Sequence, residues 1–111
     1  MIEVTLFQQN GELTGFTSAG HAGYDDEGLD IVCSAVSALT QTAVAAAADA
    51  VGEEMLAWEM EKGYLSFSAH LKNPEKRQKV ALLLRALQIG LTMIQEQYPE
   101  YVSIRTREDG R

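Results

Sequence analysis

One short stretch of the sequence holds residue types that could perform covalent chemistry. Cys33 is the only cysteine in the chain, and His21 is one of two histidines. Asp30 stands directly before the apolar pair Ile31 and Val32, where its carboxylate can cap a helix by accepting a hydrogen bond from one of the first N–H groups. This pattern places Cys33 in the first turn of a helix.

A thiol at that position lies near the positive end of the helix dipole, which favours the thiolate. The nearby Asp30 charge opposes ionisation, so the dipole and His21 have to outweigh it. If His21 folds back over the helix end, it can exchange a proton with Cys33, as in covalent catalysis. The first N–H groups of the helix could hold a developing oxyanion, and Ser37 follows Cys33 by one turn on the same face.

Other interpretations of Cys33 remain open. A lone cysteine often serves as a small buried hydrophobic residue. Zinc accepts thiolate, imidazole and carboxylate ligands, but one cysteine and one local histidine are a small set, so we expect no metal and no cofactor. Redox chemistry is disfavoured because the chain has no second cysteine to resolve an oxidised thiol.

The segment between His21 and Cys33 is polar and acidic. Its residues Tyr24, Asp25, Asp26 and Glu27 are most simply a solvated loop. They could instead orient His21 as a third catalytic member, or bind a basic segment of a substrate. Of these two functional interpretations we prefer the second, because an acidic loop attracts a basic peptide.

Hydrophobic periodicity predicts the elements that position this stretch. Alternating patterns predict strands at residues 1–8, 13–19, 56–61, 65–71 and 102–107, and Asn10-Gly11 and Gly63 are typical of hairpin turns. A first helix, rich in alanine, should run from residue 31 to about 51 and stop at Gly52. A second should open at Asn73-Pro74 and end at Pro99.

The resulting order is ββαββαβ. Two hairpins and two amphipathic helices most simply bury their apolar faces as an α+β two-layer sandwich, with both helices packed on one mainly antiparallel sheet. The length of 111 residues predicts one domain covering 1–111. The first helix should begin where the second strand ends, which places the His21–Cys33 stretch at that junction.

Charge, cysteine count and apolar content indicate which partners and which compartment to expect. The formal charge is −7 and the basic residues are scattered, so we expect no direct nucleic acid binding. A single cysteine cannot form an internal disulfide, which indicates a reducing compartment. The unbroken apolar runs are short and the N-terminal residues carry no basic leader, so we expect a cytoplasmic protein with no membrane partner.

Two sequence motifs resemble those of a known protein family. Gly20-His21-Ala22, followed after a short loop by Asp30-Ile31-Val32-Cys33-Ser34-Ala35-Val36-Ser37, resembles the signature of the ribosomal-processing cysteine proteases, the Prp family. The close match covers residues 20–37. Ser34 departs from the pattern, in which alanine is commoner.

The resemblance implies a cytoplasmic endopeptidase that removes the N-terminal extension of a large-subunit ribosomal protein, cutting after an aromatic residue. It matches Cys33 to the nucleophile, His21 to the base, and Gly20, Asp30 and Ser37 to supporting positions of the active site. It also implies a homodimer and a mobile loop at residues 22–29. The alternative function is a non-enzymatic ribosome-associated binding or adaptor protein with a structural cysteine.

Overall fold

The computed structural model describes residues 1–26 and 30–109. Its seven elements follow the predicted order: β1 (Ile2–Gln9), β2 (Glu12–Ala19), α1 (Ile31–Val51), β3 (Leu56–Glu61), β4 (Tyr64–Ala69), α2 (Pro74–Gln97) and β5 (Val102–Glu108). The predicted helix and strand bounds lie within two residues of these at every end, and those of α1 and β3 agree at both ends.

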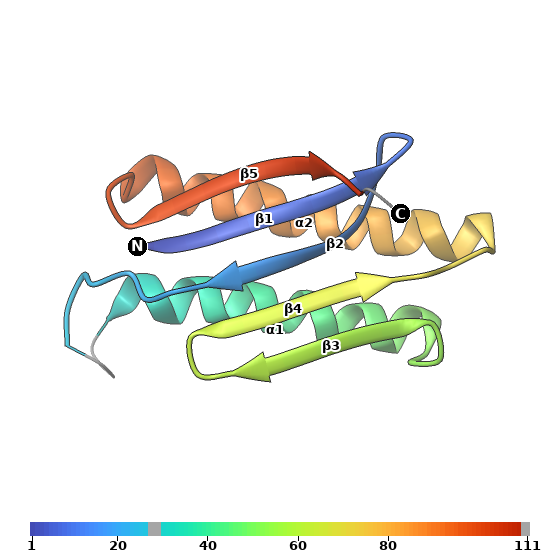
Figure 1. Cartoon of the computed structure of the whole chain (residues 1–111), viewed down its shortest axis with the longest axis horizontal. Coiled ribbons are helices and arrows are strands. Elements are labelled where there is room, and N and C mark those ends of the chain that lie inside the picture. Colours follow the sequence, from blue (N-terminus) through green and yellow to red (C-terminus); the bar gives the residue numbers. More distant parts are fainter. Residues whose placement is uncertain (27–29, 110–111) are drawn as a thin grey trace.

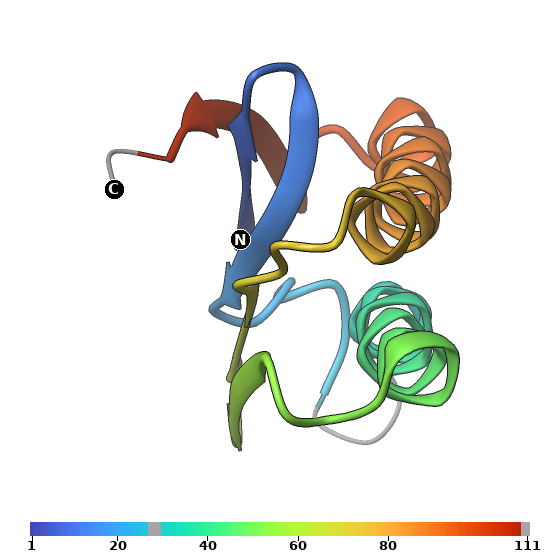
Figure 2. The same ribbon diagram turned by 90° about the vertical axis from the view of Figure 1, so that its right-hand side faces the viewer.

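The five strands form one sheet in the order β3-β4-β2-β1-β5 (Figure 1). Three of the neighbouring pairs are antiparallel, whereas β5 runs parallel to β1. Both helices lie side by side on one face of this sheet, so the molecule has two layers (Figure 2). The predicted α+β sandwich is therefore confirmed, including its mainly antiparallel sheet.

The first hairpin forms at the predicted dipeptide. Asn10 and Gly11 both have positive φ values, 51° and 81°, the conformation that a tight hairpin turn requires and that few other residue pairs adopt. The alternating residues Ile2, Val4 and Leu6 of β1 are buried against the helices. This alternation fixes the face of the sheet that carries the core.

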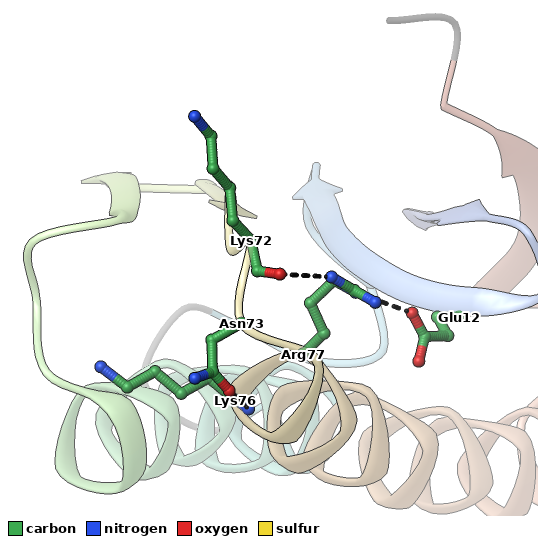
Figure 3. Close-up of polar contacts among 5 residues, drawn as sticks. All are labelled: Glu12, Lys72, Asn73, Lys76 and Arg77. Atoms are coloured by element: carbon green, nitrogen blue, oxygen red, sulfur yellow. Dashed lines mark hydrogen bonds and ion pairs between the residues drawn. The ribbon is translucent and has the colours of Figure 1, made fainter.

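Helix α2 begins at the predicted cap. The Asn73 side chain accepts a hydrogen bond from the Lys76 N–H at 3.0 Å. One turn later, Arg77 donates to Glu12 of β2 at 3.2 Å and to the Lys72 carbonyl at 2.7 Å (Figure 3). These contacts fix the start of α2 to the sheet, at the end of the molecule remote from α1's first turn.

The two helices approach each other closely at small residues. A Cβ atom on Gly90 of α2 would lie 2.9 Å from Leu39 Cδ1 of α1, so glycine at this position permits the close approach. Ala43 and Ala47 follow Leu39 by one and two turns on the same face of α1, and both are buried. Their lack of bulk permits close packing of the two helices.

By length and composition alone, α1 could cross a membrane. The sequence expectation rested on unbroken apolar runs, which serine, threonine and glutamine interrupt in this helix. In the structure Val32, Val36 and Val44 of α1 belong to the hydrophobic core, as expected for a helix that packs on a sheet.

Candidate active site

His21 follows the end of β2 and lies against the turn of the β3–β4 hairpin. The Gly20 N–H donates to the Gly63 carbonyl at 2.9 Å. Gly63 has a φ of +76°, and a Cβ atom there would lie 2.8 Å from His21 Nε2. The hairpin turn therefore leaves room for the imidazole only because residue 63 is glycine.

Cys33 lies in the first turn of α1, as predicted, and its side chain is half-buried. The backbone N–H of Ala22, the residue after His21, donates to Cys33 Sγ at 3.2 Å. This bond brings the end of β2 and the start of α1 into direct contact. The residue beside the imidazole thus touches the sulfur.

Asp30 caps α1 and also holds the preceding loop. Its carboxylate is buried, with 5% of the residue exposed, and Oδ1 accepts from the Cys33 N–H at 2.9 Å. Oδ2 accepts from the Tyr24 N–H at 3.0 Å. The predicted helix cap is confirmed, and the second bond is a role that the sequence did not suggest.

The two hydrogen bonds decide the ionisation of Asp30. Burial acts to raise the pKa of this carboxyl, but the N–H donors of Cys33 and Tyr24, with smaller contributions from the Cys33 thiol and Asp25, act more strongly together. The net pKa lies below its ordinary value, so Asp30 is a carboxylate at neutral pH.

The pKa of the Cys33 thiol shifts in the direction opposite to the one that the helix dipole favours. Burial raises the pKa of the Cys33 thiol, and the adjacent Asp30 charge raises it further, whereas the Ala22 N–H lowers it. The net pKa lies above its ordinary value. The surroundings of the sulfur in the folded protein therefore oppose the thiolate that a first-turn position favours.

Two cavities meet at this thiol, and His21, Cys33 and Ser37 line both. The first, of about 150 Å³, lies toward the β3–β4 hairpin and includes Met60 and Tyr64. The second, of about 310 Å³, lies toward the loop; its other lining residues are Gly23, Asp25, Asp30 and Ser34. An extended chain could therefore pass on either side of Cys33.

The loop residues singled out from the sequence have different surroundings. Tyr24 packs edge-on against Tyr98 and Tyr101, with ring centroids 5.5 and 5.2 Å apart. Asp25 lines the larger cavity and accepts from the Asp26 N–H at 2.7 Å. Glu27 lies outside the described residues, as does part of the loop that the resemblance implied to be mobile.

Sequence reasoning missed the contribution of the β3–β4 hairpin. Gly63, Met60 and Tyr64 reach the site because β4 pairs with β2, placing Tyr64 opposite Ala19. No local signal gives this pairing, since it depends on strand order across the sheet.

In residues 1–26 and 30–109, no group of three or more His, Cys, Asp or Glu side chains is placed to hold a metal ion.

A thiol in the first turn of a helix, lining the same cavities as an imidazole, is typical of enzymes that use covalent thiol catalysis. Comparison with known protein families identifies which class of thiol enzyme this is. Residues 1–103 match the family model of the cysteine protease Prp, and the chain belongs to this family. It is a cysteine-type endopeptidase of ribosomal protein processing.

Individual relatives cover nearly the whole chain. The ribosomal processing cysteine protease Prp of Bacillus subtilis strain 168 is 32% identical over 110 residues, spanning 96% of this chain and 97% of that protein. The crystal structure of Prp from S. aureus with a covalently linked product peptide has a TM-score of 0.81 at 25% identity, covering 96% of this chain and all of that one. The protein SMU.848 from Streptococcus mutans has a TM-score of 0.79 at 30% identity, covering 98% of this chain and 96% of its own.

Proposed function

We propose that residues 1–111 act as one Prp-like protease domain that removes the N-terminal extension of a large-subunit ribosomal protein, with Cys33 as nucleophile and His21 as base. The observation that carries this proposal is the meeting of both side chains in the same two cavities. The contact between Ala22 N–H and Cys33 Sγ, at 3.2 Å, supports it.

The raised pKa of Cys33 determines when His21 acts. Because burial and Asp30 raise the pKa of the Cys33 thiol, we propose that the proton leaves as the sulfur attacks the peptide carbonyl. His21 takes that proton and then donates it to the leaving amine, which produces a thioester. Water, deprotonated by His21, hydrolyses the thioester and regenerates the thiol.

Both cavities carry acidic side chains beside the thiol, and this supports a substrate with a basic residue near the cleaved bond. Glu61 lines the hairpin-side cavity, next to Met60 and Tyr64. Asp25 and Asp30 give the loop-side cavity negative charge, which suits a basic residue. The peptide bound covalently to the S. aureus relative supports a peptide as substrate here.

Location and assembly are part of the same proposal. We place the protein in the cytoplasm, where its substrate is made, and we propose that it forms a homodimer. The outer face of α2 supports the dimer, since Leu82, Ile89 and Met93 are 70, 50 and 62% exposed and lie along one side of the helix. A two-fold interface would cover this stripe with its own copy.

The catalytic assignment can be tested with a peptide that copies the extension of the organism's ribosomal protein. We expect cleavage by the unmodified protein and its loss in Cys33→Ala and in His21→Ala, with folding preserved. The other histidine provides the matched control, because His70 lies outside both cavities and His70→Ala should cleave normally. Cleavage that survives Cys33→Ala would exclude this nucleophile.

The dimer can be tested by light scattering. Ile89→Glu places a charge in the apolar stripe and should give a monomer. Met55→Glu, at a residue of similar exposure in the turn before β3, should leave the mass unchanged. A dimer that persists in Ile89→Glu would exclude this face.

A further inference from the structure

Two N–H groups in the first turn of α1 already donate hydrogen bonds within the helix cap. The Cys33 N–H, which neighbours the nucleophile, donates to Asp30 Oδ1 at 2.9 Å. The next N–H, of Ser34, donates to the Asp30 carbonyl at 3.1 Å. The sequence expectation that these groups bind the oxyanion therefore conflicts with the observed capping, in which a buried carboxylate already uses the nearest donor.

One backbone donor does point at the reacting atom. The Ala22 N–H lies 3.2 Å from Cys33 Sγ, and a neutral thiol is a weak acceptor. When sulfur bonds to the carbonyl carbon, the oxygen that gains charge is only two bonds from sulfur. A donor in contact with Sγ is therefore within a small shift of the oxyanion, which is a far stronger acceptor.

This peptide group is fixed on both sides. Before it, Gly20 donates to Gly63 of the hairpin at 2.9 Å. After it, Tyr24 donates to the buried Asp30 carboxylate at 3.0 Å. Ala22 itself is buried, with 4% exposed. A donor that is held in place before the reaction needs no reorganisation when charge develops, which is the condition for electrostatic catalysis.

We propose that the backbone N–H of Ala22 is the oxyanion donor of this protease. The inference rests on the proposed role of Cys33 as nucleophile. In the step concerned, the Sγ–C bond forms, the thiol proton passes to His21, and the carbonyl π electrons move to oxygen. The Ala22 N–H then donates a hydrogen bond to this negatively charged oxygen. When the oxygen pair returns, the C–N bond breaks and the amine leaves with the proton from His21.

The sole cysteine allows this N–H to be removed without changing a side chain. A synthetic 1–32 thioester, carrying lactic acid in place of Ala22, can be ligated to residues 33–111 through Cys33 itself. The ester replaces one N–H by oxygen. We expect kcat on the substrate peptide to fall by about 10²–10³-fold relative to the all-amide protein assembled in the same way, with KM little changed.

Alkylation by iodoacetamide separates this role from simple thiolate stabilisation, because that reaction forms no oxyanion. On its alkaline plateau, where the thiol is fully ionised, the ester protein should react at least as fast as the all-amide protein. An ester at Asn10, in the exposed β1–β2 turn and outside both cavities, should leave kcat unchanged. An unchanged kcat at Ala22, or an equal fall in hydrolysis and alkylation, would overturn the proposal.

A second measurement applies if the ester protein does not fold. In ¹⁵N-labelled protein, a peptide aldehyde that adds to Cys33 creates an oxygen at the oxyanion position, whereas carboxamidomethylation does not. We expect the Ala22 amide proton to shift downfield in the aldehyde adduct alone. The same shift in both adducts would exclude Ala22, while an all-amide protein without activity would count against the nucleophile instead.

Discussion

Replacing Asp30 should lower the stability of the fold while making Cys33 more acidic. The carboxylate accepts hydrogen bonds from the N–H groups of Cys33 and Tyr24, and its charge raises the pKa of the Cys33 thiol. Asp30→Asn keeps one oxygen for the helix cap but turns an NH₂ group toward the Tyr24 N–H. Asp30→Ala removes both acceptors.

The magnitudes follow from the two bonds. Losing a hydrogen bond to a buried charged group costs about 1.5–3 kcal/mol, which is the expected destabilisation of Asp30→Asn. Loss of the cap adds about 0.5–2 kcal/mol, so Asp30→Ala should cost about 2–5 kcal/mol. For 111 residues, an unfolding entropy of about 2.1 cal/mol/K per residue converts each kcal/mol into roughly 4 °C of Tm.

Two assays on the same proteins test this reasoning. Thermal unfolding should rank the wild type above Asp30→Asn and Asp30→Ala, and the pH midpoint for alkylation of Cys33 should fall in both variants because the negative charge is gone. Asp49→Asn, at an exposed carboxylate on the same helix, should change neither quantity. A variant at Asp30 that is as stable as the wild type, or whose alkylation midpoint rises, would refute the account.

The stability difference should also depend on pH. The pKa of Asp30 is depressed in the folded state, so the stability that this carboxylate contributes is present above its unfolded pKa of about 4 and is lost as pH falls through the folded value. The gap in Tm between wild type and Asp30→Asn should therefore narrow below about pH 4. A gap that is constant from pH 7 to pH 3 would contradict the assignment of the charge.

Three further outcomes are expected. Gly63→Ala should reduce peptide cleavage at least about tenfold, since its Cβ would meet the His21 ring and a misplaced catalytic group lowers the rate. Gly11→Ala introduces a similar backbone strain but has open space around it, so it should keep its activity. Full loss of activity in Gly11→Ala would contradict the explanation by contact with His21. The alkylation midpoint of wild-type Cys33 should lie above the ordinary thiol value of about 8.5, and a lower midpoint would show that burial and Asp30 do not dominate. Tyr24→Ala should destabilise the fold by about 1–3 kcal/mol through its two edge-on ring contacts; Tyr24→Phe should recover most of that loss in thermal unfolding, and no recovery would exclude the ring packing.

Local chemistry was enough to predict most of the elements. The caps at Asp30 and Asn73 and the turn at Asn10-Gly11 each depend on residues within a few positions of one another, and the structure has all three. The placement of Cys33 in the first turn of α1 follows from the same kind of signal. These interactions are specified by neighbours in the chain, so no knowledge of the tertiary structure is needed.

Features that depend on distant pairings could not be predicted in this way. The hairpin turn at Gly63 reaches His21 through the register of β2 with β4, and Tyr24 meets Tyr98 across more than half of the chain. The direction of the Cys33 pKa depends on how deeply the fold buries the sulfur, which the position in a helix does not reveal. The sequence therefore predicts the local motif of the site, whereas the long-range contacts around it are seen only in the tertiary structure.

The parallel pairing of β5 with β1 has a consequence for biosynthesis. Ile2 lies opposite Val102, so one side of the first strand to be made stays without its neighbour until a hundred further residues have been translated. Such a long loop closure slows folding relative to local contacts. During elongation the segment carrying Cys33 leaves the ribosome well before the sheet that supports it is complete, so proteolytic competence should arise only once the C-terminal strand has docked.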